Sequence, residues 1–328
     1  MDRFLKKRMP MEFYLGIVIL MMVLFFSITT DEFFTLRNIL DLTEGYAVSG
    51  IFALGLFVVL VTGGIDISFA AVASVVQYAI ASLLLGGYID GALQSILLAV
   101  ALGIFCGLFN AVLIYYLNLV SIIITISVQS LLFGILMWLT NGRSIYDLPE
   151  WWTTQHEIFP FTIGTDAYQI GLPFLLMLTL TFITWIILNK TNLGRQLFAV
   201  GGSQESARRV GIRVGLIHLF AYGYLGAAAA IGGLVQVYRM GEVVPNALVG
   251  GELDVLAATV LGGASLTGGK GTVIGTLMGV FLIGILKNGL NLIGVSSYFM
   301  NIVIGVVIVI AISITHYKKR KETNVGFA

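Results

Sequence analysis

The chemistry open to this sequence rests on polar side chains that lie within long apolar segments. They are carboxylates, carboxamides and one lysine, namely Glu44, Asp66, Gln77, Asn110, Gln129, Glu252, Asp254, Lys287, Asn288 and Asn291. An ionisable group near the centre of a bilayer costs at least about 2.5 kcal/mol, so such groups face a bundle interior, an aqueous path or the interface. The carboxylates lie at segment ends, where they can be interfacial or begin a helix. For the deeper Asn110, Asn288 and Asn291, interhelical hydrogen bonds and path lining are equal alternatives.

The sequence contains no pattern typical of catalysis or of metal binding. Its histidines, His156, His218 and His316, are scattered, and its single cysteine, Cys106, lies inside an apolar segment. Zinc-protease, serine-hydrolase and paired-carboxylate motifs are all missing from the sequence. We therefore expect no catalytic residue, no metal site and no cofactor.

A glycine-rich tract at 262–272, GGASLTGGKGT, has part of the spacing of a phosphate-binding loop. That motif requires lysine followed by serine or threonine directly after its last glycine. Here Gly269 takes the place of the lysine, and Lys270 is followed by Gly271. The tract therefore favours close approach of helices and a backbone break between membrane segments over nucleotide binding.

A second polar stretch, the basic loop at about 190–214, has a short helical pattern from Gln204 to Val210 between glycines. Ser203 is placed to cap the N-terminus of that helix. Two interpretations of this loop have equal weight from the residues alone. It is either a positively charged topology loop without a partner or a docking helix for a cytoplasmic protein.

The elements that must position these residues are membrane helices. The chain of 328 residues is 58% hydrophobic and only 11% charged, whereas soluble domains carry about 25% charged residues. Ten apolar segments recur, near 11–30, 43–62, 67–86, 93–116, 119–140, 170–189, 215–238, 253–264, 272–287 and 297–315. The third is broken at its start by Gly63-Gly64-Ile65-Asp66, and the eighth is too short to cross as a regular helix. The sequence thus predicts an all-α membrane protein of about ten helices, some of them broken, in a single domain over 1–328.

Charge sets the expected orientation. Lysine and arginine gather in the N-terminal tail, in the loop at 190–214 and in the C-terminal tail, which an even span count puts on the cytoplasmic side. The largest opposite loop, about 141–169, carries Trp151 and Trp152, which favour an interfacial aromatic belt over a short surface helix. The similar stretches 58–66 and 259–267 suggest an inverted five-plus-five repeat. The net charge of +1 gives no reason to expect a nucleic-acid partner.

Three motifs resemble the permeases of ribose-type ABC importers. The first is Val61-Thr62-Gly63-Gly64-Ile65-Asp66-Ile67-Ser68, although Phe69-Ala70 departs from the Val-Gly that usually follows it. The second lies within 194–212, with Gly202-Ser203 where the family has Gly-Asn. The third runs from Glu252 to Thr276 and extends into 288–296. The three motifs occur in the family's order over most of the chain.

This resemblance implies a permease subunit in the bacterial plasma (inner) membrane, with both termini cytoplasmic. Its partners would be a second permease copy or a sister permease, a cytoplasmic ATPase, an external solute-binding protein and the lipid bilayer. ATP would be hydrolysed by the partner, so the chain itself would not be an enzyme. The residues expected to couple to the ATPase are Gly194, Arg195, Gly201, Gly202, Glu205, Ala207, Arg208, Arg209 and Gly211. The residues expected to line the translocation path are Asp66, Ser68, Asn110, Gln129, Asn288 and Asn291.

Other readings of the sequence remain open. The substrate of such an importer could be a sugar or similar small polar solute, or instead a nucleoside or a vitamin. A different class of protein, the ion-driven secondary transporter, would need a titratable site at mid-membrane, and Asp66 beside a broken helix could provide it. Transport by such a protein would persist without an ATPase and would collapse with an uncoupler.

Overall fold

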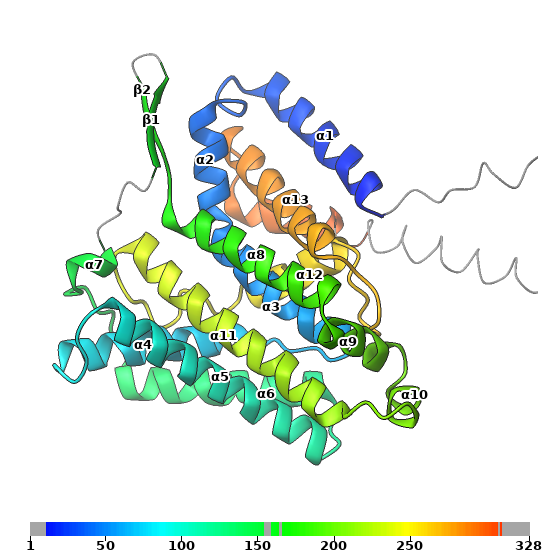
Figure 1. Ribbon diagram of the computed structural model, residues 1–328. Coiled ribbons are helices and arrows are strands. Elements are labelled where there is room, and N and C mark those ends of the chain that lie inside the picture. The colour runs from blue at the N-terminus through cyan, green and yellow to red at the C-terminus, as the bar shows by residue number, and fades with distance from the viewer. Residues whose placement is uncertain (1–10, 154–158, 164–165, 308, 310–328) are drawn as a thin grey trace, which may run out of the picture.

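The structure is a computed structural model that describes residues 11–153, 159–163, 166–307 and 309. The basic N- and C-terminal tails, His156, His316 and part of the tenth apolar segment lie outside the described residues. The described chain is almost entirely helical, with one small hairpin (Figure 1). Its elements are α1 (Met11–Thr29), α2 (Leu36–Gly45), α3 (Ala47–Val61), α4 (Phe69–Leu85), α5 (Ala92–Tyr116), α6 (Ser121–Thr140), α7 (Glu150–Thr153), β1 (Phe159–Ile163), β2 (Asp166–Ile170), α8 (Leu172–Lys190), α9 (Asn192–Gly202), α10 (Gln204–Arg209), α11 (Val214–Met240), α12 (Glu252–Leu261) and α13 (Val273–Leu292).

Six described helices are long and apolar enough to cross a bilayer, namely α1, α5, α6, α8, α11 and α13. The pair α2 and α3, bent by 44°, makes a seventh when it is counted as one span. Each of the ten apolar segments coincides with at least one helix, but α4, α12 and Ser297–Val307 are shorter than a regular span. The chain is thus an all-α membrane protein with six or seven candidate spans, and the count of ten stays a prediction.

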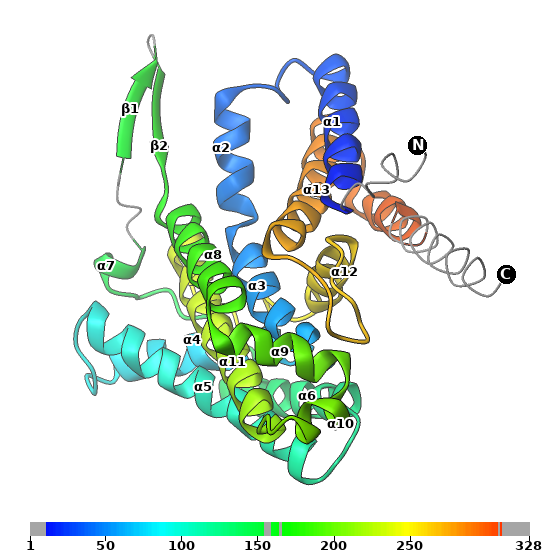
Figure 2. The ribbon, with the colours of Figure 1, turned by 45° about the vertical axis from the view of Figure 1, so that its right-hand side comes forward.

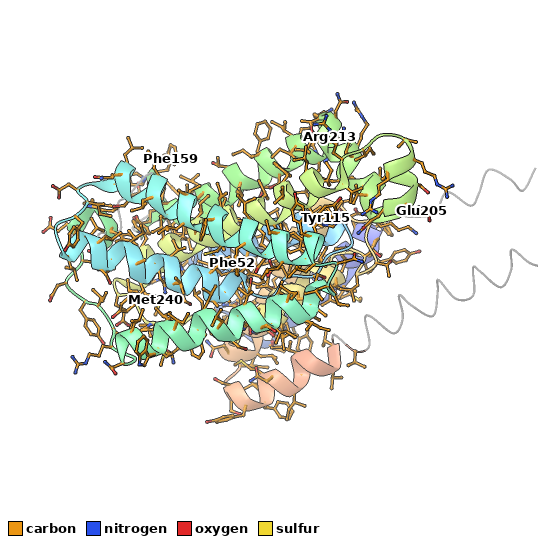
Figure 3. The ribbon with its side chains drawn as sticks, turned by 90° about the horizontal axis from the view of Figure 1, so that it is seen from below. Phe52, Tyr115, Phe159, Glu205, Arg213 and Met240 are labelled. Carbon is orange, nitrogen blue, oxygen red and sulfur yellow. The ribbon has the colours of Figure 1, made fainter. Side chains whose placement is uncertain are left out.

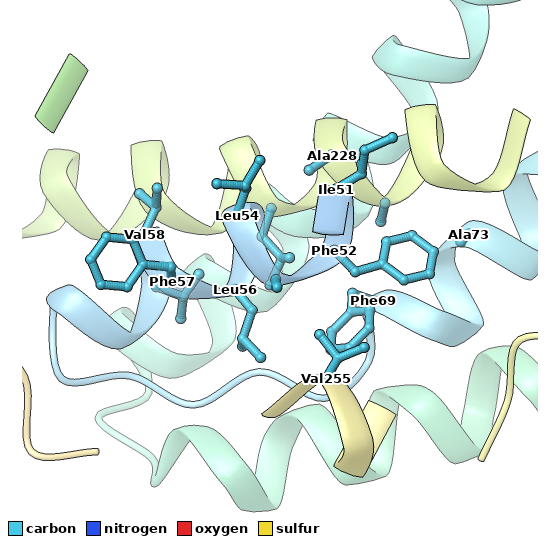
Figure 4. Packing of buried hydrophobic residues seen from close by; sticks show 14 of the residues in the cluster. Ile51, Phe52, Leu54, Leu56, Phe57, Val58, Phe69, Ala73, Ala228 and Val255 are labelled. Carbon is cyan, nitrogen blue, oxygen red and sulfur yellow. The ribbon is translucent and has the colours of Figure 1, made fainter. Parts of the chain in front are cut away.

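Helix α3 forms the centre of the bundle. Fourteen of its fifteen residues are buried, and it packs against α8, α11, α12 and α13. Phe52 of α3 meets Phe69 at the start of α4, with ring centroids 5.2 Å apart, and Val255 of α12 belongs to the same core (Figure 4). Helix α3 is apolar all round because protein surrounds it, whereas α1 and α6 leave most of their apolar surface exposed.

Glycines bring α5 and α11 into close contact. A methyl group on Gly103 of α5 would overlap the backbone carbonyl of Gly226 of α11, and a methyl group on Gly226 would overlap that of Gly103. Without a hydrophobic driving force between membrane helices, small residues that allow such close packing supply much of the attraction. Helix α11 thus lies between α5 and the central helix α3, in contact with both.

The large loop at about 141–169 differs from the favoured expectation. Trp151 and Trp152 lie on the short helix α7, and Trp152 is 3% exposed, with its Nε1 donating a hydrogen bond to the Leu234 carbonyl at 3.0 Å. The aromatic-belt interpretation is therefore wrong for Trp152, which anchors the loop on α11 instead. Beyond it, β1 and β2 pair antiparallel with Phe159 opposite Ile170. The hairpin and α10 lie at opposite ends of the molecule (Figure 2).

Candidate coupling junction and translocation path

The basic loop folds into two helices with defined N-terminal caps. The Thr191 side chain accepts a hydrogen bond from the Gly194 amide at 3.2 Å, which begins α9. The Ser203 side chain accepts from the Ser206 amide at 3.2 Å, which begins α10 and confirms the predicted cap. Helix α10 ends at Arg209, one residue before the predicted end, and Gly211 follows it with a φ of +85°.

The predicted coupling residues divide into two groups. The charged side chains of Arg195, Glu205, Arg208 and Arg209 are exposed, and Glu205 and Arg209 form an ion pair at 2.5 Å. Three of the small residues, Gly194, Gly201 and Ala207, pack against neighbouring parts of the chain, whereas Gly202 and Gly211 are exposed. A methyl group on Gly194 would overlap the Leu188 carbonyl, and Ala207 is buried. The two helices therefore present charge outward from a firmly packed base.

The three sequence motifs meet at one point, which we call the glycine junction and define as Val61, Gly63, Gly201, Gly268 and Gly269. The Gly269 amide donates a hydrogen bond to the Val61 carbonyl at 2.9 Å. A methyl group on Gly201 would overlap this same carbonyl, and one on Gly268 would lie 2.8 Å from the Gly63 Cα. The backbones of α9, the break after α3 and the 262–272 tract thus lie in direct contact.

Backbone conformation explains why several of these positions are glycine. Gly63, Gly268 and Gly269 adopt φ values of +84°, +85° and +68°, a region that is costly for residues with a Cβ. The predicted break after α3 and the predicted break at 262–272 are both present. That the two breaks pack on Gly201 was not predicted. The only sequence signal was the glycine content of each motif.

The break between α3 and α4 is stabilised by side chains from neighbouring helices. The Ile65 amide donates to the Ser121 hydroxyl at 3.0 Å, and the Ile67 amide donates to the Thr125 hydroxyl at 3.4 Å. Both hydroxyls belong to the first turns of α6. Because lipid supplies no hydrogen bonds, α6 must satisfy the backbone of this segment.

Three of the six predicted path residues form a buried, hydrogen-bonded cluster. Asp66 Oδ1 accepts hydrogen bonds from the Ser68 amide at 2.8 Å and from the Ser68 hydroxyl at 2.7 Å. Asn110 Nδ2 donates to Asp66 Oδ2 at 3.2 Å and to Ser68 Oγ at 2.8 Å. All three residues are almost fully buried. The cluster ties α5 to the break, and a role of these residues in the path stays a prediction.

The other three predicted path residues do not share the hydrogen bonds of this cluster. Gln129 donates to Glu252 Oε1 at 2.6 Å, which links α6 to α12. Asn288 and Asn38 exchange two amide hydrogen bonds at 2.9 and 3.0 Å, so Asn288 forms an interhelical contact. Asn291 is exposed. The hydrogen bonds of the described residues therefore do not join all six into one network.

An ion pair that the path prediction left out lies on the same side of α13 as Asn291. Lys287 Nζ contacts Asp254 Oδ2 at 2.7 Å, and the two side chains are 31% and 44% exposed. Lys287 lies within the span-length helix α13, and Asn291 follows one turn later on the same face. A half-exposed ion pair on a membrane helix is costly against lipid, so this face needs water or protein beside it.

The described residues contain no group of three or more histidine, cysteine, aspartate or glutamate side chains that could hold a metal ion.

Comparison with known proteins gives a consistent result. A family model described as the permease component of branched-chain amino acid transport systems matches residues 38–312. The chain is similar to the ribose import permease protein of Escherichia coli strain K12, with 34% identity over 97% of each chain. It is 35% identical to that of Bacillus subtilis strain 168 over 93% of this chain and 92% of that protein. It is also 31% identical to the galactose/methyl galactoside import permease protein of Escherichia coli strain K12 over 94% of each chain. No solved structure matches the chain.

Proposed function

This chain belongs to the family of transport-system permease components, and we propose that it is the permease subunit of an ATP-driven importer for a sugar. The observation that carries the proposal is the similarity along almost the whole chain to import permeases. In such a system a separate cytoplasmic subunit hydrolyses ATP, and an external protein delivers the solute.

The proposed substrate class rests on the relatives that match over most of their length. Their names give ribose, galactose or methyl galactoside, and D-allose, all of which are polyhydroxylated and uncharged. The family description refers to branched-chain amino acids instead. We favour a monosaccharide because the sugar permeases align with nine-tenths or more of this chain.

Coupling to ATP hydrolysis would pass through α9 and α10. The exposed charges of Arg195, Glu205 and Arg209 offer a docking surface for the ATPase. Displacement of α10 would move α9, and the backbone contacts of Gly201 would carry that movement to Val61 and to the 262–272 tract. Tightly packed segments of this kind transmit displacement because they deform little.

The path would run along the face of α12 and α13 that carries Asp254, Lys287 and Asn291. Polar groups that are exposed in the single chain become acceptable in a membrane when they line an aqueous path or meet another subunit. A second permease copy or a sister permease placed against this face would enclose the path. This proposal replaces Asp66, Ser68 and Asn110 as lining residues.

We further propose ten membrane segments with both termini in the cytoplasm. This number comprises six spans, the bent pair α2–α3, the short helices α4 and α12, and the helix Ser297–Val307. The basic loop at 190–214 sets the cytoplasmic side. The paired breaks at 62–68 and 262–272 are compatible with an inverted five-plus-five repeat.

An ion-driven secondary transporter is the less favoured alternative. Asp66 would have to bind and release a cation, but its two oxygens already accept three hydrogen bonds from Ser68 and Asn110.

Co-purification tests the proposal. The tagged chain, extracted gently from its native membrane, is expected to bring along an ATP-hydrolysing subunit in stoichiometric amount. Uphill transport of solute by the purified chain alone would overturn the assignment.

A further inference from the structure

A pocket with cationic and aromatic walls opens where α5 ends and α11 begins. Its volume is about 430 Å³, and its lining includes Tyr115, Tyr116, Arg208, Arg213, Leu216 and Leu219. We call it the inner-end pocket. Tyr115 and Arg213 lie toward the same end of the molecule as Glu205 of α10, and Phe159 and Met240 lie toward the other end (Figure 3).

The charge of the inner-end pocket fits an anion. Arg208 and Arg213 both line it, and no carboxylate is among its lining residues. Arg208 lies over the Tyr115 ring, with its guanidinium carbon 6.0 Å from the ring centroid. Glu205, a nearby carboxylate, already pairs with Arg209. A guanidinium can bind phosphate oxygens with two parallel hydrogen bonds, which makes a phosphate ester a well-matched ligand.

The wall of the pocket continues into an apolar strip that runs along the membrane face of α5. Tyr116 is 69% exposed. Towards the N-terminus of α5, exposed apolar side chains recur every three or four residues, at Val112, Phe109 and Phe105. Residues at this spacing share one helix face. Leu216 of α11 is also exposed beside the pocket. An occupant therefore meets two arginines at one end and a hydrocarbon-like strip along its length.

We propose that the inner-end pocket binds the headgroup of an anionic phospholipid, with an acyl chain lying along the α5 strip. Basic pockets between membrane helices on the cytoplasmic side are suited to such headgroups. The apolar strip favours a lipid over free phosphate, because free phosphate has no acyl chain to lie along it. It also favours a lipid over a cytoplasmic protein, because such a protein would not extend along the membrane face.

The location gives the lipid a regulatory role. Arg208 belongs to α10, whereas Arg213 and Leu216 belong to the start of α11. A phosphate held by both arginines would fix α10 against the bundle. Anionic lipid would then change how movement of α10 reaches the glycine junction. Lipid binding itself needs no ATPase, so its test is independent of the importer proposal.

Native mass spectrometry of the purified chain in detergent tests the proposal. The probes are dioleoyl phosphatidylglycerol and dioleoyl phosphatidylcholine, titrated separately. The wild-type chain is expected to hold one phosphatidylglycerol in clear preference to phosphatidylcholine. The double variant Arg208→Gln with Arg213→Gln is expected to bind phosphatidylglycerol about 30-fold more weakly.

Arg209→Gln is the matched control, because it removes one neighbouring exposed charge that does not line the pocket. It should retain the lipid, and melting temperatures in the same detergent should be equal for all variants. Equal binding of the two lipids, or unchanged binding by the double variant, would overturn the proposal. Displacement of the lipid by millimolar inorganic phosphate would reassign the pocket to a free anion. A double variant that keeps the lipid but loses the ATPase would reassign it to the partner subunit.

Discussion

Replacing Gly201 by alanine tests whether the glycine junction transmits movement. The added methyl group would overlap the Val61 carbonyl and lie 2.5 Å from the Gly269 amide nitrogen, so it enters the hydrogen bond between them. Ordinary carbon contacts need about 3.5 Å, so α9 must retreat or the bond must open. Overpacking costs about 1–3 kcal/mol, and the lost hydrogen bond costs about 1 kcal/mol. We expect destabilisation of about 2–4 kcal/mol, with a marked loss of coupled uptake.

Gly202→Ala provides the matched control. A methyl group on Gly202 would meet no atom within 4 Å, although the position is adjacent and on the same helix. Its stability should change by no more than about 0.5 kcal/mol. Thermal unfolding of both variants in detergent, followed by solute uptake in membranes that contain equal amounts of each, gives the comparison. If the two variants unfold at the same temperature and support equal uptake, the junction does not have the proposed role.

Three further predictions concern charges and buried hydrogen bonds. Arg209→Glu reverses an exposed charge of α10 that lies outside the inner-end pocket. The variant chain should still insert into the membrane, but less ATPase should co-purify with it. An undiminished yield of ATPase would argue against docking on α10. Lys287→Glu should impair uptake, because it places two carboxylates together. Adding Asp254→Lys should restore much of the uptake. If uptake assays find no loss in the single variant, this ion pair does not belong to the path. Ser68→Ala removes the hydroxyl that donates to Asp66 Oδ1 and accepts from Asn110 Nδ2, so a destabilisation of about 1–3 kcal/mol is expected in thermal unfolding. An unchanged melting temperature would contradict the structural role of the cluster.

Local features of the fold could be predicted from the sequence. The cap at Ser203 and the break at Gly63 depend on residue type within a few positions, so short-range physical chemistry determines them. Apolar length placed a helix in each predicted segment, and six or seven of these in the described chain are candidate spans. It could not decide whether the short helices α4 and α12 cross fully, because tertiary packing fixes how far such helices extend.

The roles of polar residues were harder to predict. Asp66 and Asn110 look like path residues in the sequence because each is polar within an apolar stretch. In the structure they hydrogen-bond to one another and to Ser68, a pairing that depends on how α5 packs, and their part in the path stays a prediction. Trp152 failed as a belt residue for the same reason, since its partner is a carbonyl of α11. Membership of a family motif indicated which glycines matter, but not that three motifs meet.

The energy source of transport tests the central claim most directly. Cells that express the complete system are loaded with the labelled transported sugar and treated in two ways, either by depleting ATP or by adding a protonophore while ATP is maintained. The account predicts that accumulation stops when ATP is depleted and continues in the presence of the protonophore. Accumulation that survives ATP depletion and collapses with the protonophore would contradict it.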